Sequence, residues 1–342
     1  MSGGVDSSVA AALLREQGHD VVGLSMQLYD QRGRIDGTAT FGSCCTRVAG
    51  TLGFPHYIVN FERQFDETVI SNFVREYASG RTPLPCAHCN SDLKFSTLLE
   101  RAIGLGAEQV ATGHYARVER REDGRWLLKR SADQQKDQSY FLFSLTQAQL
   151  ARAMFPVGGL TKPQVREEAR RLGLSVAEKA DSQEICFVPT GDYAAFVAQQ
   201  QPEVARPGAI VDQRGVKLGE HAGVHHFTIG QRKGLGIAAP APLYVLKLDP
   251  ATSTVVVGSR DALAQTKLTA SGVNWIAEDA PADWIRVEAQ IRHRHTPAPA
   301  RLRALAPDRA ELEFDLPQPA ITPGQAVVFY REDVVVGGGW ID

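Results

Sequence analysis

The chain has 342 residues, 43% of them hydrophobic and 22% charged, which is typical of a globular protein of about two or three domains. No apolar run approaches the roughly 20 residues of a membrane span, and no signal peptide opens the sequence, so we expect a cytoplasmic protein without membrane contact. The net charge of −2 excludes a globally basic nucleic-acid binder and leaves only a local basic patch. Five cysteines, an odd number, argue against a secreted disulfide framework and favour catalytic or metal-binding thiols.

The first predicted element is a glycine turn that opens a helix. The stretch Ser2–Ser8 carries two glycines and three serines, and Val9–Arg15 has the pattern of a buried helix. Such a turn directs backbone N–H groups and the positive end of the helix dipole at a phosphate. Asp6 can orient the loop or help to hold Mg²⁺. No Gly-Lys-Ser/Thr follows at the Walker A spacing, and an ordinary turn before a helix is the alternative.

Strands and helices alternate up to residue 200, which predicts an α/β domain with a parallel sheet. The expected strands are 21–26, 56–59 and 109–112, and the expected helices are 48–52, 65–78, 93–103, 161–172 and 192–200. A polar loop is expected at 30–43, an extended Pro-rich segment at 80–85 and a hairpin at 116–129 around Asp123-Gly124. A phosphate loop of this kind follows a buried strand, and because only Met1 precedes it, we expect that strand to be missing from the sequence.

The composition changes near Pro202, where short alternating strands and Gly/Pro turns replace long helices. Strands are predicted at 210–211, 216–218, 244–248, 254–258, around Leu302, and at 310–314, 326–330 and 334–339. This pattern is typical of compact β domains. We therefore predict three domains: 1–200, a small central β domain at 201–262, and a C-terminal β-barrel at 263–342.

Cysteines supply the most reactive side chains of the sequence. Cys86 and Cys89 form a C-x-x-C motif, which by itself is compatible with a redox pair, with half of a metal site or with a chance spacing. A helix start follows them, and a helix N-terminus lowers a thiol pKa. Cys186 follows polar residues and precedes a phenylalanine, as expected of a pocket-lining thiol, whereas adjacent Cys44 and Cys45 are expected to be structural. An iron–sulfur cluster on Cys86, Cys89 and Cys186 is an alternative.

The loop SGGVDSS resembles the PP-loop of the ATP pyrophosphatases, which bind the pyrophosphate of ATP and transfer AMP. Seven stretches, in the family's order, make the whole chain similar to the bacterial tRNA-specific 2-thiouridylases: SGGVDSS, RTPLPCAHCNSDLKF, ATGHYA, KDQSYFL, DSQEICF, FTIGQRKGLGI and TPGQAVVFY. The resemblance implies a PP-loop domain (adenine nucleotide alpha hydrolase-like), then a β-rich central domain and a barrel. It also implies ATP-dependent conversion of the wobble uridine of tRNA to 2-thiouridine.

The resemblance assigns the chemistry to two cysteines. The cysteine directly before Asn-x-x-[IL]-Lys-Phe is the family's nucleophile, Cys89 here, and that of the ICF stretch carries a persulfide, Cys186 here. ATP and Mg²⁺ would adenylate the uracil C2 oxygen and so make AMP the leaving group. Sulfur would come directly from the Cys186 persulfide, or as hydrosulfide released by Cys89 with formation of a Cys89–Cys186 disulfide. A persulfide donor protein is implied.

Binding positions also follow from the resemblance. It assigns ATP contacts to Met1, Ser2, Gly3, Gly4, Val5, Asp6, Ser7, Met26 and Gly113. It assigns the target base to Leu84, Pro85 and Cys86, and further tRNA contacts to His114, Lys136, Asp137, Gln138, Arg292, His293 and Gln325. Further arginines at 286, 301 and 303 favour phosphate contact at the barrel. The expected partner is a tRNA anticodon stem-loop, and the protein is expected to be a monomer.

The chain departs from the family pattern in three places. The family usually has Asn where Leu84 stands, some members have an acidic residue where Cys86 stands, and an acidic segment that normally follows Thr46 is absent before Arg47. Two other functions compete with the thiouridylase interpretation. One is another PP-loop AMP-forming ligase, such as argininosuccinate synthetase, although such enzymes lack the pair of Cys89 and Cys186. The other is a catalytically impaired tRNA-binding protein.

Overall fold

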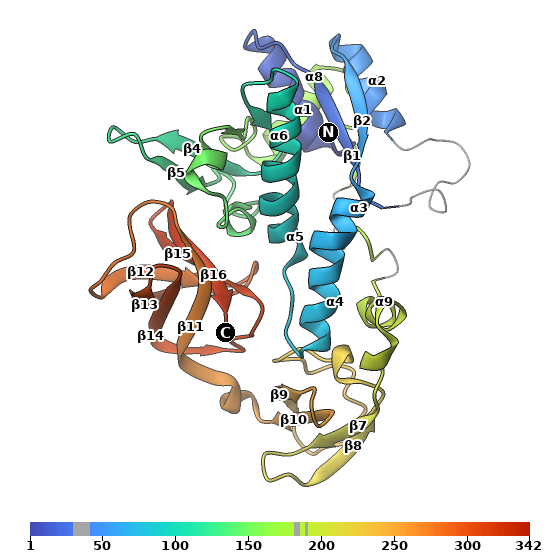
Figure 1. The fold of residues 1–342 in the computed structure, drawn as a ribbon, viewed down its shortest axis with the longest axis vertical. Helices are drawn as coiled ribbons and strands as arrows, with labels where there is room; N and C mark the ends of the chain where they lie inside the picture. Colours follow the sequence, from blue (N-terminus) through green and yellow to red (C-terminus); the bar gives the residue numbers. More distant parts are fainter. Residues whose placement is uncertain (30–41, 181–184, 189–190) are drawn as a thin grey trace. The chain divides into compact units, whose positions relative to one another are not determined.

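The computed structural model describes residues 1–29, 42–180, 185–188 and 191–342 (Figure 1). The chain forms two compact units. The first unit contains Met1–Val69, Cys86–Gln183 and Asp333–Val335, and the second contains Ile70–Pro85, Glu184–Glu332 and Val336–Asp342. The loop predicted at 30–43 falls almost entirely outside the described residues, as does the start of the DSQEICF stretch.

The first unit contains parallel strands, as the sequence predicts, although the strand at Ala153–Met154 is not among those predicted. Strand β1 (Gly23–Gln27) pairs with β2 (His56–Asn60), and β3 (Val110–Ala111) pairs with β6 (Ala153–Met154), both in parallel. The same unit contains the helices α1 (Val5–Glu16), α2 (Ser43–Leu52) and α8 (Lys162–Arg171). Helices α1 and α8 share a core cluster, in which Val5 and Val9 of α1 lie with Val165 of α8. Helix α1 is buried on most sides, as expected of its almost wholly apolar sequence after Ser8. As predicted, Thr161 caps α8, in a capping box with Gln164.

The helix that carries the C-x-x-C motif starts earlier than the sequence predicts. It consists of α5 (Pro85–His88), the π-helix η3 (Cys89–Thr97) and α6 (Leu98–Gly104). The prediction that Pro85 is extended is therefore wrong, because proline is well accepted at the first position of a helix. The helix predicted at 65–78 is present as α3 (Glu62–Phe65), the π-helix η2 (Asp66–Ile70) and α4 (Ser71–Ala78).

The predicted hairpin is confirmed. Strands β4 (Ala116–Arg120) and β5 (Trp126–Arg130) pair in antiparallel fashion on either side of Asp123-Gly124. We call the segment that follows, residues 131–138, the β5–η4 loop; η4 (Ser139–Phe141) and α7 (Gln147–Leu150) come next. Val334, at the start of β16, pairs with Lys129 of β5.

The second unit contains a four-stranded sheet and a barrel. The sheet has the order β8 (Lys217–His221), β7 (Gly208–Val211), β10 (Thr254–Gly258) and β9 (Tyr244–Asp249). Short helices connect its parts: α9 (Tyr193–Gln200), η5 (Pro202–Val204), η6 (Val224–His226) and η7 (Arg260–Leu263). The predicted helix at 192–200 is α9, which Asp192 caps.

The barrel closes through pairing of its first and last strands. Its order is β11 (Ala264–Trp275), β14 (Arg309–Pro319), β13 (Ala298–Ala306), β12 (Ile285–Gln290), β15 (Ala326–Arg331) and β16 (Val334–Ile341), which pairs with β11. Small and branched apolar side chains fill its core. Sequence patterning missed β11 and β12, although Ile285, Val287 and Ala289 of β12 alternate with polar residues. Among the described helices, none has the length and apolar character needed to cross a membrane.

Candidate active site

The Ser2–Ser7 segment, which we call the PP-loop, closes on itself in front of α1. Gly3 has a φ of +73°, which favours glycine, and Gly4 is the N-cap of α1. The hydroxyls of Ser7 and Ser8 both donate to the carbonyl oxygen of Gly4, at 3.3 and 2.9 Å. The Ser2 N–H donates to the Ser7 hydroxyl at 3.2 Å. The loop thus stands at the N-terminus of a 12-residue helix, where anions bind favourably.

Asp6 is held by two residues that sequence reasoning missed. The Lys162 ammonium lies 2.8 and 2.9 Å from the two carboxylate oxygens of Asp6, and the Tyr115 hydroxyl donates to one of them at 2.8 Å. Lys162 is buried, with 8% of its surface exposed. Because both carboxylate oxygens accept hydrogen bonds, Asp6 fits the predicted role of orienting the loop, and its alternative role toward Mg²⁺ stays a prediction. In the part of the chain that the structure describes, no group of three or more His, Cys, Asp or Glu side chains could hold a metal ion.

Two further residues, Lys179 and Gly113, contact the backbone of the PP-loop. The Lys179 ammonium donates to the carbonyl oxygen of Gly3 at 2.9 Å. Gly113 lies directly against the loop: a Cβ there would be 2.5 Å from the backbone nitrogen of Ser7 and 2.6 Å from the carbonyl carbon of Asp6. Only glycine allows this approach, so Gly113 shapes the PP-loop by its missing side chain.

The other predicted nucleotide residues lie on β1 and before the loop. The Ser25 hydroxyl donates to the carbonyl oxygen of Met1 at 2.7 Å and contacts the His56 ring at 2.8 Å. Met26 is half-buried and pairs with Val59 of β2. The structure therefore places every residue predicted to contact ATP in the first unit.

Cys89 lies inside the helical run, in the π-helix η3. Its side chain is buried, whereas Cys86 is exposed. Burial raises the pKa of the Cys89 thiol, and the nearby Lys94 ammonium lowers that pKa. Lys94 donates to the Asn90 side chain at 2.9 Å, and Asn90 donates to the carbonyl oxygen of Phe141 at 3.1 Å. The expectation that a helix N-terminus controls this thiol is wrong, because the helix starts one turn before Cys89.

His114 follows β3 in the same unit. Its Nδ1 lies 2.7 Å from the Thr112 hydroxyl, and its ring packs edge-on against Phe155. Burial, and then the charge of Lys94, hold the pKa of His114 well below its usual range. The imidazole is therefore neutral at pH 7, and a contact with RNA would be a neutral hydrogen bond rather than an ion pair.

Cys186 belongs to the second unit. It lies in a tight turn, in which the Val188 N–H donates to the carbonyl oxygen of Ile185 at 2.9 Å, and its side chain is exposed. The neighbouring Phe187 is buried and packs edge-on against Phe73 of α4, with ring centroids 5.1 Å apart. An anchored phenylalanine thus fixes a turn whose cysteine faces solvent.

The segment predicted to contact the target base is held by the barrel. Leu84 and Pro85 are buried. The Gln325 side chain donates to the carbonyl oxygens of Thr82 and Pro83, at 3.1 and 3.2 Å. Gln325 thus fixes the two residues that precede Leu84 and Pro85 in the second unit, while Cys86 belongs to the first unit.

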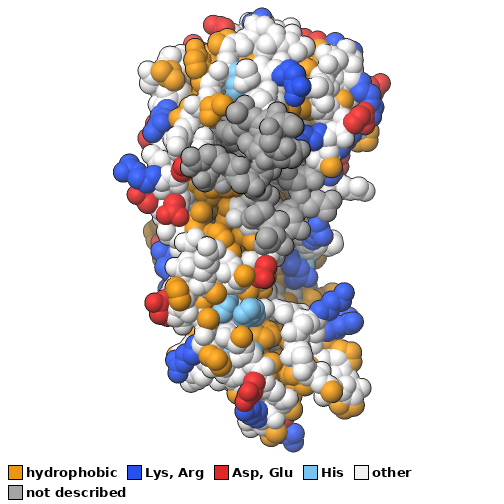
Figure 2. All heavy atoms as spheres, turned by 90° about the vertical axis from the view of Figure 1, so that its right-hand side faces the viewer, with side chains coloured by type: hydrophobic (Ala, Val, Ile, Leu, Met, Phe, Trp, Pro, Cys, Tyr) orange, Lys and Arg blue, Asp and Glu red, His pale blue; other side chains and the backbone are white. Residues whose placement is uncertain are grey.

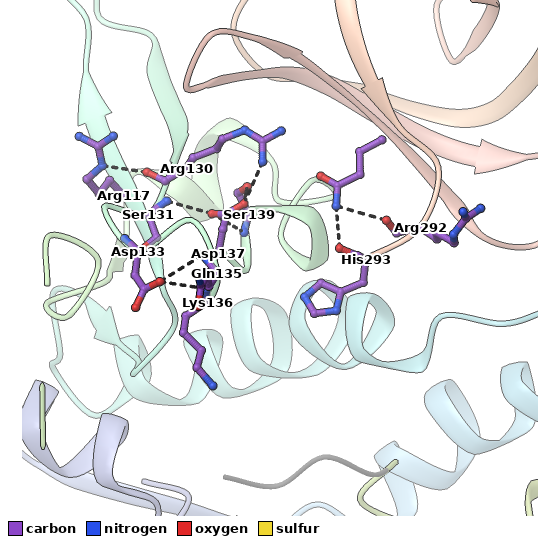
Figure 3. A network of polar contacts seen from close by, with 11 residues as sticks. Arg117, Arg130, Ser131, Asp133, Gln135, Lys136, Asp137, Ser139, Arg292 and His293 are labelled. Atoms are coloured by element: carbon purple, nitrogen blue, oxygen red, sulfur yellow. Dashed lines mark hydrogen bonds and ion pairs between the residues drawn. The ribbon is translucent and has the colours of Figure 1, made fainter. Parts of the chain in front are cut away.

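The β5–η4 loop carries three predicted tRNA contacts (Figure 3). The Asp137 carboxylate is buried and accepts hydrogen bonds from the Ser131 N–H at 2.9 Å and the Ser139 hydroxyl at 2.7 Å, with Arg130 at 3.3 Å. Asp137 therefore fixes the loop from within. Lys136 is exposed, which favours it over Asp137 as the residue that reaches RNA.

Arg292 and His293 lie in the turn after β12. The Gln290 side chain donates to the carbonyl oxygens of both residues, at 3.2 and 2.8 Å (Figure 3). The arginines expected to add to this basic patch are instead neutralised by strand β14: Arg286 pairs with Asp315, Arg301 with Glu313 and Arg303 with Glu311, each at 2.7 Å. On the face in Figure 2, too, lysines and arginines are dispersed among acidic side chains.

Comparison with known proteins decides the family. Residues 1–190 match the tRNA methyl transferase HUP domain, 194–259 the tRNA methyl transferase PRC-barrel domain, and 265–341 the Aminomethyltransferase beta-barrel domain. Over its whole length the chain is 53% identical to the tRNA-specific 2-thiouridylase MnmA of Geotalea uraniireducens and 52% identical to that of Solibacter usitatus, covering 93% and 98% of those proteins. The chain belongs to the tRNA-specific 2-thiouridylase family.

Membership in the 2-thiouridylase family confirms the predicted family and the predicted fold class, with its α/β domain, small β domain and barrel. The interpretation as a different PP-loop ligase does not fit. A solved structure, the U34-tRNA thiolase NcsA from Methanococcus maripaludis with its [4Fe-4S] cluster, is 19% identical, with a TM-score of 0.35 over 59% of this chain and 65% of that one. A likeness at this level says nothing of this chain's cofactor.

Sequence reasoning on this 2-thiouridylase missed the residues that hold the PP-loop. Lys162 and Lys179 contact residues 156 and 176 positions away, and Tyr115 contacts Asp6 over 109 positions. Lys162 has the sequence signature of a helix start, and nothing local indicates its partner. For Tyr115, the only signal was its place in the ATGHYA stretch.

Proposed function

We propose that the protein adenylates the C2 oxygen of the wobble uridine of tRNA with ATP and replaces that oxygen with sulfur from a Cys186 persulfide, with Cys89 as the nucleophile. The observation that carries this proposal is the closed PP-loop, whose Asp6 carboxylate pairs with the Lys162 ammonium and accepts a hydrogen bond from the Tyr115 hydroxyl. Family membership supports the tRNA substrate and the use of ATP. The wobble position and the roles of individual residues are our inference.

The PP-loop suits the triphosphate of ATP. Gly3 and Gly4 leave the backbone open to close approach, and the N-terminus of α1 favours negative charge. Pairing of Lys162 with Asp6 removes a negative charge that would repel phosphate. Lys179 brings a second ammonium group to Gly3. The phosphates of ATP would bind Mg²⁺, and both the need for this ion and a contact between it and Asp6 remain predictions.

The chemistry follows from the leaving group. The uridine C2 oxygen is a poor leaving group. When this oxygen attacks the α-phosphate of ATP, pyrophosphate is released, and the oxygen becomes part of an AMP leaving group. Attack of sulfur on C2 then expels AMP. If the terminal sulfur of the Cys186 persulfide attacks C2 directly, Cys89 must then attack the Cys186 sulfur, which breaks the bond to the transferred sulfur and leaves that sulfur on C2. If Cys89 attacks the persulfide first, it releases hydrosulfide, and the hydrosulfide attacks C2. On both routes the two cysteines end as a disulfide that a thiol reductant must reopen with two electrons. Both routes remain open.

The positions of the cysteines suit these roles. Cys186 is exposed, so a persulfide donor protein can reach it. Cys89 is buried, which holds the pKa of its thiol above the usual value, and the Lys94 ammonium offsets part of that rise. The anticodon stem-loop as partner, with contacts at His114, Lys136 and Arg292, remains a proposal. So do a monomeric state and the domain boundaries at 200 and 262.

A thiolation assay tests the proposal. An unmodified tRNA anticodon stem-loop is incubated with ATP, Mg²⁺ and a persulfide donor, and 2-thiouridine is measured by nucleoside mass spectrometry. We expect product that requires ATP and is lost in Cys186→Ser and in Cys89→Ser. Retention of product in either variant would remove that cysteine from the mechanism. Loss of product in Cys86→Ser as well would favour the iron–sulfur alternative.

A further inference from the structure

Two connections lead from the β5–η4 loop to the PP-loop, and both end on the same carboxylate. In the first, one oxygen of Asp133 accepts hydrogen bonds from the N–H groups of Gln135 and Lys136, at 3.1 and 3.3 Å. Figure 3 shows this carboxylate turned toward the Lys136 turn. Its other oxygen accepts the N–H of Lys162 at 2.9 Å, at the first turn of α8. The Lys162 side chain then reaches both oxygens of Asp6.

The second connection runs through Tyr115. The N–H of Gln138 donates to the carbonyl oxygen of Tyr115 at 2.8 Å, and the Gln138 side chain accepts the Tyr115 N–H at 2.9 Å. The Tyr115 hydroxyl donates to Asp6. Gln138 and Asp133 therefore tie the two sides of the β5–η4 loop to Asp6 by different routes.

Lys136 lies between these two attachments and is exposed to solvent. The loop around it is stiff, because Asp137 binds Ser131 and Ser139 within it. Helix α8 is stiff relative to the PP-loop, because α8 and α1 share one buried core. All these residues belong to the first unit. A ligand that stabilises the Lys136 turn therefore also stabilises the arrangement that holds Asp6.

We propose that Asp133, Lys162 and Tyr115 are positioning residues that couple the β5–η4 loop to the PP-loop, so that RNA bound at Lys136 and nucleotide bound at the PP-loop strengthen each other's binding. This inference rests on the proposed function, which assigns ATP to the PP-loop and tRNA to Lys136. Coupling between two sites is reciprocal, so each ligand must tighten the other by the same factor. Typical couplings are roughly 5- to 150-fold.

The test measures both affinities in the presence and absence of the other ligand. The probes are α,β-methylene-ATP, which resists cleavage between its α- and β-phosphates, and an unmodified anticodon stem-loop with uridine at the wobble position. In the wild type we expect each probe to tighten the other by about 5-fold or more. In Asp133→Asn the factor should fall toward one. Asparagine keeps one acceptor oxygen for the turn and replaces the other with an NH2 group that cannot accept the Lys162 N–H.

Controls separate this coupling from general stability. Asp123→Asn changes an aspartate at the tip of the β4–β5 hairpin, where it contacts only nearby residues, and should leave the coupling factor unchanged. Tyr115→Phe removes one hydroxyl from the second route without changing the shape of the side chain, and should reduce the factor even if Asp133→Asn does not fold. Equal coupling in the wild type and in folded Asp133→Asn and Tyr115→Phe would overturn the inference. So would independent binding of the two probes to the wild type. Failure of either probe to bind at all would instead overturn the proposed function.

Discussion

Replacing Gly113 with alanine tests how closely the PP-loop depends on its neighbour. A methyl group at Gly113 would lie 2.5 Å from the Ser7 nitrogen and 2.6 Å from the Asp6 carbonyl carbon, well inside the contact distance of such atoms. Both atoms are backbone, so the loop itself must move. Overpacking of this kind costs about 1–3 kcal/mol. Because the displaced backbone belongs to the PP-loop, this cost should weaken nucleotide binding by about 5- to 150-fold, since 1.4 kcal/mol changes a dissociation constant about tenfold.

The assay is calorimetric titration of α,β-methylene-ATP into Gly113→Ala, with circular dichroism to show that the variant is folded. Gly50→Ala is the matched control, because a Cβ at Gly50 in the exposed face of α2 meets nothing within 4 Å. Alanine there should leave nucleotide affinity unchanged and should slightly stabilise the helix. Wild-type nucleotide affinity in Gly113→Ala would refute the reasoning that Gly113 shapes the PP-loop.

Three further predictions concern charge. Lys94→Met should raise the pKa of Cys89 and slow its alkylation by iodoacetamide near pH 8, while Lys94→Arg should not; equal rates in all three proteins would contradict this. Because burial and then Lys94 lower the pKa of His114, the free energy of unfolding should decrease as pH falls below about 6.5. The decrease should be shallower in His114→Gln, as measured by urea titrations between pH 5 and 8. In Arg292→Ala, the slope of the logarithm of stem-loop affinity against the logarithm of salt concentration should become shallower by roughly 0.7–0.9 per lost phosphate contact. In Arg303→Ala, which removes an arginine already paired with Glu311, this slope should change little.

Local patterns predicted the elements whose structure is itself locally determined. The Asp123-Gly124 turn indicates its hairpin, because glycine accepts the φ of +91° found at Gly124. Thr161 and Pro163 mark the start of α8 in the same way. Alternation of strands and helices was enough to predict a parallel sheet in the first unit, but it did not reveal the two-residue strand β6.

Contacts between distant residues were beyond this kind of reasoning. The PP-loop was found from its residues, but the pairing of Asp6 with Lys162 depends on how α8 packs against α1, which no short pattern encodes. Likewise, Arg301 and Arg303 look like a basic patch in sequence, and only the register of β13 against β14 reveals the glutamates beside them. The sequence did not predict β11, because register shifts in its pairing with β14 and β16 interrupt the alternation of its inward residues.

The most direct test of the proposed chemistry follows the oxygen that sulfur replaces. A stem-loop whose wobble uridine carries ¹⁸O at C2 is turned over once with unlabelled ATP and a persulfide donor, and the AMP is analysed by mass spectrometry. If the C2 oxygen is adenylated, AMP formed in step with 2-thiouridine must contain one ¹⁸O atom. AMP without the label, formed alongside 2-thiouridine, would contradict the proposed activation of the base by ATP.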